Sequence, residues 1–342
     1  MAQRIMDDII DLELEKIEKI IAKIDSDPES EEVKEAEKHL WEKIYKKSGQ
    51  GRRTGVGITA EGDMLAAMGL RYGTEEATEF SEQVHKTIAL EAYRSSVNMA
   101  KERGAFAIYD SEREKNNPFI NRLKEADPEL YEEMKKYGRR NIACLTIAPT
   151  GTTSLMTQTT SGIEPVFMPV YKRRRKVNPN DPQTHVDFVD ETGDAFEEYI
   201  VFHHKFVEWM TVNGYDPTKR YTQEEIDKLV EKSPYYKATS NDVDWLMKVK
   251  MQGHIQKWVD HSISVTINLP NDVDEDLVNR LYVEAWRSGC KGCTVYRDGS
   301  RSGVLISNKK KDKKEEMPPC KPPTVVEVRP KVLEADVIRF QN

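Results

Sequence analysis

The chain has 342 residues, of which 32 % are charged and 38 % belong to the hydrophobic set, a composition typical of a globular protein with many helices. Its net charge of −7 argues against a general nucleic-acid-binding protein. It has no run of roughly 18 apolar residues for a membrane helix and no signal-peptide pattern, and four cysteines are too few for a secreted disulfide scaffold. We therefore expect a cytoplasmic protein with no membrane partner.

The first 48 residues predict a charged helical segment. Apolar residues recur three and four positions apart along residues 5–24, which predicts an amphipathic helix: Leu14, Ile17, Ile21 and Ile24. Asp27-Pro28 supplies an N-cap and a first-turn proline for a second, highly charged helix that reaches about Lys47. The glycine-rich run from Gly49 to Gly57 predicts a turn after it.

The next hundred residues predict three helices and then a buried strand. The helices span about Asp63–Met68, Glu75–Arg103 and a segment that opens at Asp127-Pro128 and ends at Gly138. The short apolar run Asn141–Ile147 lies between two arginines and a proline, which favours a buried strand.

Helices and strands alternate again up to about residue 300. We expect helices over Asp194–Val212, Thr222–Lys232, Asp242–Val259 and Asp274–Ser288, and strands over Ser262–Leu269 and Gly292–Tyr296. Thr222 and Glu225 form a capping-box pattern at the start of the second of these helices. This alternation predicts an α/β architecture with largely parallel strand pairing.

The composition changes after residue 306. Residues 307–323 include a lysine-rich run and a proline-rich run, neither of which can build an apolar core, so we expect a flexible linker. Residues 324–342 regain β-branched residues and are interpreted as the start of a truncated carboxy-terminal domain.

One segment has the composition of a phosphate-binding loop. It follows the predicted strand directly and contains four hydroxyl side chains around a glycine: Ala148, Pro149, Thr150, Gly151, Thr152, Thr153 and Ser154. A glycine lets backbone N–H groups approach an anion closely, and a helix that begins there would add partial positive charge. It is not a Walker A loop. Local chemistry leaves a phosphate site and a polar helix-capping turn equally open.

Other candidate groups favour structural roles. Cys290 and Cys293 form a CxxC without a second pair, so structural thiols are favoured over a redox pair or half of a zinc site. The basic run Tyr171–Lys176 is interpreted as a solvated loop rather than a nucleic-acid contact. His203 and His204 belong to no metal-binding pattern, and we assign no metal ligand and no catalytic residue.

Several separated segments, taken together, resemble the adenosylcobalamin-dependent (class II) ribonucleotide reductases. They occur in the order found in that family and cover roughly residues 50–305: Arg53–Gly57 with Asp63–Leu65, Ala148–Ser154, Ser161–Phe167, Tyr171–Arg175, Thr266–Pro270 and Gly289–Arg301. The basic run and the last segment are more similar to the B12-dependent branch than to the diiron-dependent one.

The resemblance implies that residues 49–306 form the carboxy-terminal half of a ten-stranded α/β barrel with long helices. It implies a complete enzyme that reduces ribonucleotides to deoxyribonucleotides by thiyl-radical chemistry, with adenosylcobalamin as cofactor and a thioredoxin-type reductant. It also assigns Ala148, Pro149, Thr150, Gly151, Thr152, Thr153 and Ser154 to the loop that holds the phosphates of the substrate.

The sequence departs from the family in one respect that bears on activity. It contains no Asn-x-Cys-x-Glu segment, which carries the radical cysteine in the family. We therefore expect this chain to need a complementary amino-terminal reductase chain or segment and to be inactive alone. The alternative is a non-catalytic remnant that binds a nucleotide or a partner; binding to nucleic acid ranks below both.

Overall fold

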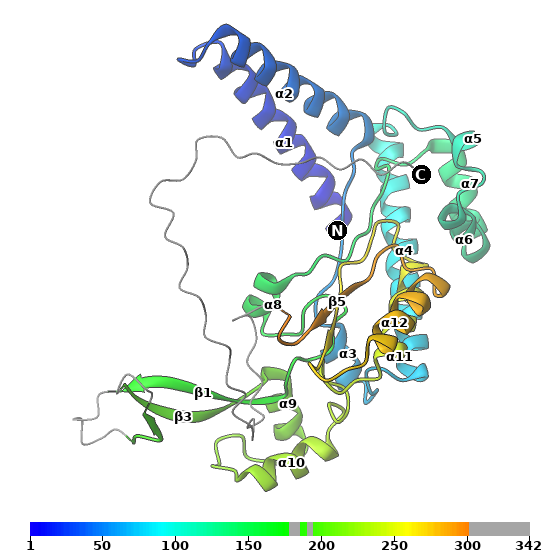
Figure 1. Ribbon diagram of the computed structural model, residues 1–342. Helices are drawn as coiled ribbons and strands as arrows, with labels where there is room; N and C mark the ends of the chain where they lie inside the picture. The colour runs from blue at the N-terminus through cyan, green and yellow to red at the C-terminus, as the bar shows by residue number, and fades with distance from the viewer. Residues whose placement is uncertain (178–184, 190–193, 301–342) are drawn as a thin grey trace. The chain divides into compact units, whose positions relative to one another are not determined.

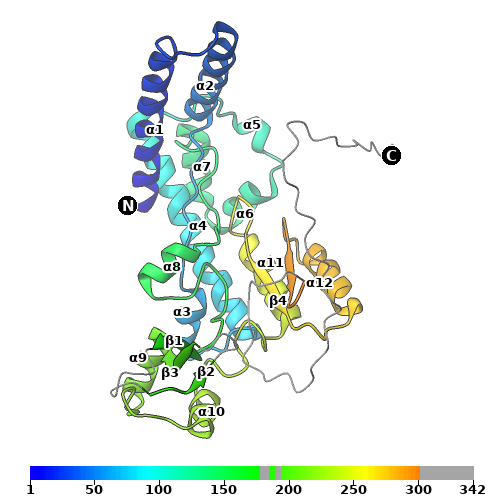
Figure 2. The ribbon, with the colours of Figure 1, turned by 60° about the vertical axis from the view of Figure 1, so that its left-hand side comes forward.

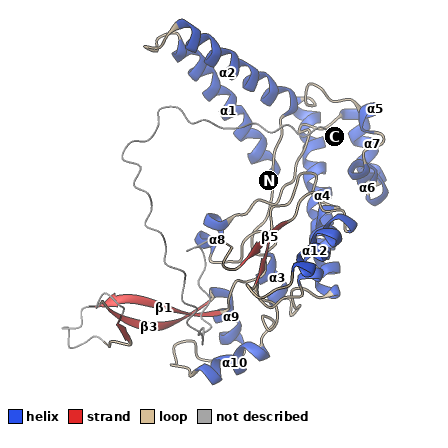
Figure 3. Cartoon of the chain, viewed as in Figure 1, coloured by secondary structure: helices blue, strands red, loops and turns tan. Residues whose placement is uncertain are grey.

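The computed structural model describes residues 1–177, 185–189 and 194–300, all within one compact unit (Figure 1). The fold is mixed α/β, mostly helical with small sheets (Figure 3), so the predicted class is confirmed at this level. The segments predicted as a linker (307–323) and as the start of a domain (324–342) lie outside the described residues. None of the described helices combines the length and the apolar character that crossing a bilayer requires.

Two helices, α1 (Ala2–Ile24) and α2 (Glu31–Gly51), pack side by side at the amino terminus (Figures 1 and 2). The predicted start of α2 at Asp27-Pro28 is wrong, because the N–H of Asp27 still bonds to the carbonyl of Ile24 and Ser30 takes the N-cap position. The helix also continues through part of the predicted glycine turn. A Cβ added to Gly51 would lie 3.4 Å from the side chain of Ile142, so the end of this helix approaches Ile142 closely.

The middle of the chain is helical, as expected, with two additions. Helices α3 (Glu61–Ala67), α4 (Glu75–Arg103) and α7 (Pro128–Tyr137) match the predicted helices closely. The sequence reasoning missed α5 (Ser111–Glu114) and α6 (Pro118–Ala126). Asn117-Pro118 gives α6 the same N-cap and first-turn proline that identified α7.

Four extended segments pair in parallel. Val56 bridges Leu145 and Ile147 bridges Ile263, while β4 (Thr266–Leu269) pairs along its length with β5 (Thr294–Arg297). We call this set the parallel array; its segments, in order across the array, are 54–57, 143–147, 261–269 and 294–297. A Cβ on Gly57 would clash with the carbonyl oxygen of Thr146, so only glycine allows the first two segments to approach this closely.

The predicted strand Asn141–Ile147 is extended and largely buried, but only Leu145 and Ile147 form bridges to neighbouring segments. The N–H groups of Cys144 and Leu145 donate instead to the carboxylate of Asp260, at 2.7 and 3.0 Å. A side chain therefore takes the place of a neighbouring strand at this point, which shortens the regular pairing.

An antiparallel pair, β1 (Val170–Val177) and β3 (Ala195–Phe202), replaces two predicted features. The helix expected over Asp194–Val212 is wrong in its first half, because only α9 (His204–Val212) is helical. The loop expected over the basic run is also wrong. Cross-strand ion pairs hold the two strands together: Arg174–Glu198, Arg175–Glu197 and Lys176–Asp194. A short strand, β2 (Phe188–Val189), pairs with the other side of β3.

The remaining helices follow the predicted order. They are α8 (Gly151–Thr157), α10 (Gln223–Lys232), α11 (Trp245–Gln256) and α12 (Glu275–Arg287). Both hydrogen bonds of the predicted capping box are present at Thr222 and Glu225. The largest apolar core lies between α4, α11 and the parallel array, with buried side chains that include Tyr93, Val97, Leu145, Ile147, Ile255 and Ile263.

Candidate functional site

The hydroxyl-rich segment Ala148–Ser154 follows the second segment of the parallel array at its carboxyl end. Ile147 is the last bridged residue, Ala148–Thr150 form the connection, and α8 begins at Gly151. The predicted strand–loop–helix order is therefore present. In α/β folds, ligands bind outside the carboxyl ends of parallel strands, where the loops are free to meet them.

Two of the four hydroxyl groups hold the loop in its shape. Thr150 has a left-handed backbone (φ 50°), and its Oγ1 accepts a hydrogen bond of 2.8 Å from the N–H of Gly162. The hydroxyl of Ser154 donates to the carbonyl of Gly151 at 2.9 Å and lies 2.7 Å from the hydroxyl oxygen of Ser161. Because Ser154 is almost fully buried, we assign its hydroxyl to loop shape.

The other part of the loop is open. Gly151, Thr152 and Thr153 are exposed, and a Cβ added to Gly151 would meet nothing within 4 Å. N–H groups in the first turn of a helix have no acceptor within the helix, so they point toward whatever lies in front of it. Backbone N–H groups beside threonine hydroxyls form an arrangement that can bind the oxygen atoms of a phosphate.

Other parts of the chain meet at residues 160–164, which contact the loop through Ser161 and Gly162. The hydroxyl of Thr59 donates to the carbonyl of Thr160 at 2.7 Å, and the N–H of Glu61 donates to the carbonyl of Gly162 at 3.2 Å. A few residues further on, Glu164 accepts a hydrogen bond of 3.0 Å from the N–H of Thr266 at the start of β4. Segments up to two hundred residues apart thus converge next to Ala148–Ser154.

A buried carboxylate, Asp63, organises one side of this region. One of its oxygens accepts from the hydroxyl of Tyr235 at 2.9 Å and lies 2.7 Å from His203 Nε2, and the other accepts from the N–H of Thr160 at 2.8 Å. Burial and the charge of Asp63 raise the pKa of Tyr235, which therefore stays protonated as a donor. His203, which belongs to no metal-binding pattern in the sequence, is held here by its contact with Asp63, and no local pattern in the sequence pointed to Tyr235.

A buried lysine, Lys248, lies at the start of β4, near Glu164. Its ammonium group donates to the carbonyl of Thr266 at 2.6 Å, and its side chain is 2 % exposed. Burial lowers the pKa of Lys248 to about 8, while the charge of Glu164 opposes this shift. The sequence reasoning missed Lys248. The signal available was its helical spacing to Gln252 and Ile255 on the inner face of α11.

The cysteine pair has the properties of structural thiols. Cys290 and Cys293 are unlinked and partly buried, and both pack against the apolar cluster beneath α12. Burial raises the pKa of Cys290 to about 12 and also raises the pKa of Cys293. Little thiolate would form at neutral pH, which favours the structural interpretation over redox or metal binding.

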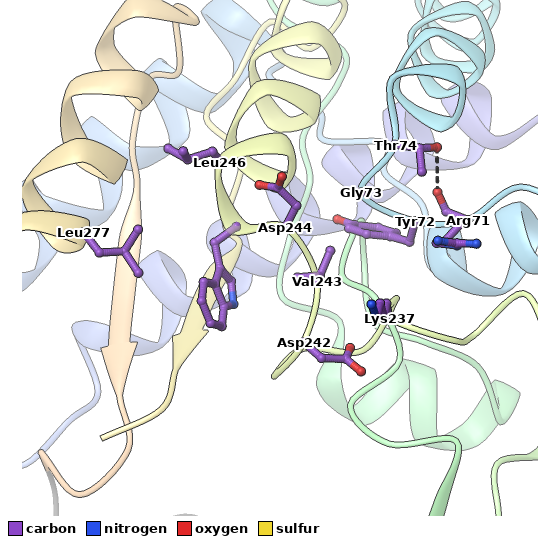
Figure 4. A pocket seen from close by; sticks show the side chains of 11 residues that line it. Arg71, Tyr72, Gly73, Thr74, Lys237, Asp242, Val243, Asp244, Leu246 and Leu277 are labelled. Atoms are coloured by element: carbon purple, nitrogen blue, oxygen red, sulfur yellow. Dashed lines mark hydrogen bonds between the residues drawn. The ribbon is translucent and has the colours of Figure 1, made fainter. Parts of the chain in front are cut away.

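Two of the cavities in the described part of the chain have volumes of about 410 and 330 Å³, and Ala148–Ser154 lines neither of these two. The larger, of about 410 Å³, lies between the α3–α4 turn and the start of α11 (Figure 4). Its polar groups mostly cap helices: Thr74 accepts from the N–H of Ala77 and donates to the carbonyl of Arg71, and Asp244 accepts from the N–H of Met247. We therefore assign no ligand to it.

A family model and several known proteins match this chain. The family model for "Ribonucleotide reductase, barrel domain" matches residues 4–296. The chain is 30 % identical over 264 residues to a vitamin B12-dependent ribonucleoside-diphosphate reductase of Mycobacterium tuberculosis, covering 75 % of this chain and 33 % of that protein. A protein of the same description from Thermoplasma acidophilum is 30 % identical over 288 residues, covering 84 % and 34 %. The chain thus spans about a third of the length of these relatives.

Proposed function

Because this chain belongs to the ribonucleotide reductase barrel domain family, we propose that it contributes the substrate-phosphate loop of a B12-dependent ribonucleotide reductase. In this proposal Ala148–Ser154 hold the phosphate groups of a ribonucleotide, either a diphosphate or a triphosphate. The single observation that supports it most is the open side of the loop: exposed Gly151, Thr152 and Thr153 at the start of α8, outside the carboxyl end of a parallel segment.

Within the loop, we assign different roles to different residues. Thr150 and Ser154 hold the backbone through Gly162 and Ser161, so that the first N–H groups of α8 keep one direction. Thr152 and Thr153 offer hydroxyl donors to phosphate oxygens. A rigid loop of this kind binds without the entropic cost of ordering itself around the ligand.

The radical cysteine would come from a segment outside these 342 residues, on the same or on a complementary polypeptide. The exposed face of α8 supports a neighbour there. Leu155 and Met156, which follow the loop directly, are 80 % and 82 % exposed, and such side chains on one turn are typical of a surface covered in the assembled protein. A thioredoxin-type reductant would serve the complete enzyme.

Adenosylcobalamin is the cofactor that the B12-dependent relatives suggest for the complete enzyme. When bound, it would supply the homolysis that starts radical chemistry. The two cavities of about 410 and 330 Å³ are of the size that accepts one small molecule, and neither is large enough to enclose a corrin ring with its nucleotide. We therefore assign no described residue to the cofactor.

Replacing Gly151 by alanine tests the loop without disturbing the fold. A methyl group there meets no atom within 4 Å, and alanine favours helix, so thermal stability should stay the same or rise slightly. Binding of a nucleoside diphosphate, measured by titration calorimetry on the assembled enzyme, should weaken by about tenfold or more, because the methyl group occupies the space of a phosphate oxygen.

Thr152→Ala should weaken the same binding by about 1–3 kcal/mol, the value of a charge-assisted hydrogen bond. Thr87→Ala is the matched control, because the hydroxyl of Thr87 is exposed and donates to the carbonyl of Gln83 within α4, outside the loop. Equal affinity of the Gly151, Thr152 and control variants would remove the loop from the substrate site.

Complementation separates this proposal from its alternative, a non-catalytic module that binds a nucleotide or a partner. Mixing the chain with an amino-terminal polypeptide that carries the Asn-x-Cys-x-Glu segment should restore B12-dependent reduction of a ribonucleotide. Leu155→Ser/Met156→Ser, on the exposed turn of α8, should weaken that assembly. Tight nucleotide binding by the chain alone, without any rescue by the partner, would favour the binding module.

A further inference from the structure

A second cavity, of about 330 Å³, lies at the opposite end of the parallel array from the phosphate loop. Its lining includes residues that precede or begin each of the four segments, Arg53, Ala143, Asp260 and Lys291, whereas the loop follows the carboxyl end of the second segment. The cavity is therefore a separate place in the fold, and nothing proposed above makes use of it.

The acidic groups around this cavity already have their full complement of donors. The carboxylate of Asp260 accepts from the hydroxyl of Tyr93 and from the N–H groups of Cys144 and Leu145. The carboxylate of Glu114 accepts two hydrogen bonds of 2.5 Å from the guanidinium of Arg139. The oxygen atoms of both carboxylates are therefore occupied, although the charge of Asp260 still attracts Lys291.

Within the described residues, two basic side chains at the cavity, Arg53 and Lys291, form no ion pair with an acidic side chain. Within residues 1–177, 185–189 and 194–300, the guanidinium of Arg53 is exposed and has no recorded hydrogen bond or ion pair. The ammonium of Lys291 donates only to the backbone carbonyl of Asp260. Partial burial and the charge of Arg122 lower the pKa of Lys291, against the attraction of Asp260. An anion at this end of the cavity could form ion pairs with Arg53 and Lys291 and would add to the attraction that Asp260 already exerts on Lys291.

Part of the remaining wall, beside the polar Asn117, is apolar. Phe119 and Ile120 from the start of α6 and Ile142 line it, and the ring of Phe119 packs against Tyr93 with centroids 5.4 Å apart. Such a wall accepts a flat or aliphatic body, and polar groups at one end fix its orientation. The volume is at the lower limit of small-molecule sites, which suits a single small ring and its acidic group.

We propose that this cavity binds a small organic anion, with its carboxylate or phosphate between Arg53 and Lys291 and its apolar body against Phe119 and Ile120. The ligand class is defined by one anionic group on a small ring. Two kinds of compound have this group: a monocyclic carboxylate and a monocyclic phosphate ester. The proposal stands whether or not Ala148–Ser154 bind the substrate.

Titration of the full chain with benzoate and with phenyl phosphate tests the proposal. We expect saturable one-to-one binding of at least one probe, and the tighter of the two identifies the acidic group. Arg53→Gln and Lys291→Gln should each weaken that binding by tenfold or more and leave the melting temperature unchanged. Arg113→Gln should have no effect, because Arg113 lies on α5 with its side chain 79 % exposed and does not line the cavity.

A second measurement separates this site from the phosphate loop. Gly151→Ala should leave the affinity for the probe unchanged, since Gly151 lies at the other end of the array. The proposal is overturned if neither probe binds saturably, if the Arg53 and Lys291 variants bind as tightly as the original chain, or if Gly151→Ala weakens binding as much as they do.

Discussion

Replacing Asp7 by alanine is expected to lower the free energy of unfolding by about 3–5 kcal/mol, the cost of removing one partner from a buried ion pair. Asp7 is fully buried on α1, and its carboxylate accepts from Arg52 Nε at 2.8 Å, Asn141 Nδ2 at 2.9 Å and Arg140 Nε at 3.2 Å. Alanine would leave these donors inside the protein without their shared acceptor. Urea unfolding measures the loss.

The same contact should also control whether α1 stays docked. Gln3 adds hydrogen bonds to Thr54 and Asn141, so the first turns of α1 attach to the start of the parallel array through polar side chains. Amide hydrogen exchange over residues 2–24 should therefore accelerate more than exchange in α4 in the Asp7→Ala variant. Equal acceleration in both helices would mean that Asp7 stabilises the whole unit rather than the docking of α1.

Asp8 is the matched control for this prediction. It is 54 % exposed and pairs with Arg103 at 2.6 Å, and an ion pair in contact with water contributes little to stability. If Asp8→Ala cost as much as Asp7→Ala, burial would not be the cause. Asp7, Asp8 and Asp11 are also close enough to suggest a cation site, but Asp7 and Asp11 already share the guanidinium of Arg52, so we assign none.

The pH dependence of stability should follow from Asp7 as well. Burial alone would raise the pKa of its carboxyl group, but the hydrogen bonds and charge of Arg52 lower the pKa below its ordinary value. A lowered pKa in the folded state gives stability that is present above the unfolded value of about 3.9 and is lost as the pH falls through the folded value. The Asp7→Ala variant should lack this acid-induced loss.

Local sequence signals predicted the helices well where caps and periodicity agreed. The bounds of α4 follow from Thr74 at the N-cap and Gly104 after the last turn, and α7 follows from Asp127-Pro128 and Gly138. A helix start within or just after Ala148–Ser154 was considered from the sequence only as a condition that would favour anion binding, and α8 does begin there, at Gly151. The family was recognised from ordered short segments, and the family match confirms it.

The errors occur where a distant partner decides the structure. Glu197 and Glu198 favour a helix in isolation, while Phe196 and Tyr199 favour a strand. The ion pairs with basic residues on β1, more than twenty residues earlier, favour the strand. Local periodicity cannot reveal these pairs, because the partners are far apart in the sequence. The same holds for the site: Asp63 meets Tyr235 across 172 positions, a contact that a single sequence cannot reveal.

The basic run illustrates how structure changes a functional argument. Five consecutive basic residues, Lys172–Lys176, suggest an anion-binding surface when they are read as a loop. In β1, three of them face acidic partners on or beside β3, so much of their charge is neutralised within the hairpin. A salt-dependent contact with nucleic acid needs basic groups that can release counterions. The pairing therefore favours a structural role for this run.

Lys248 provides the second large effect, and it concerns stability at alkaline pH. Its pKa in the folded chain is about 8, below the ordinary value of 10.5, because burial disfavours the charged ammonium. Between these two values the unfolded chain holds the proton and the folded chain has released it. The unfolded state then binds more protons, so the contribution of Lys248 to the free energy of unfolding increases with pH, by on the order of 3 kcal/mol.

Other buried groups change stability in the opposite direction over the same range. The pKa values of Cys144, Cys290 and Cys293 are all raised, and thiols that ionise only in the unfolded chain lower stability as the pH rises. The effect of Lys248 must therefore be measured as the difference in the free energy of unfolding between two chains that contain the same thiols. The free energy of unfolding of the wild-type chain minus that of Lys248→Met should increase between pH 7.5 and pH 10.5, because the thiol contributions cancel in the difference.

The control for Lys248→Met is Lys250→Met, on the same helix and exposed to solvent. It should give a difference that stays flat over this pH range, since its side chain is exposed in the folded as well as in the unfolded chain. A flat difference for Lys248 as well would mean that water reaches its ammonium group. The pH dependence of this difference in the free energy of unfolding thus tests whether water is excluded from the contact between Lys248 on α11 and Thr266. This contact lies beside Glu164.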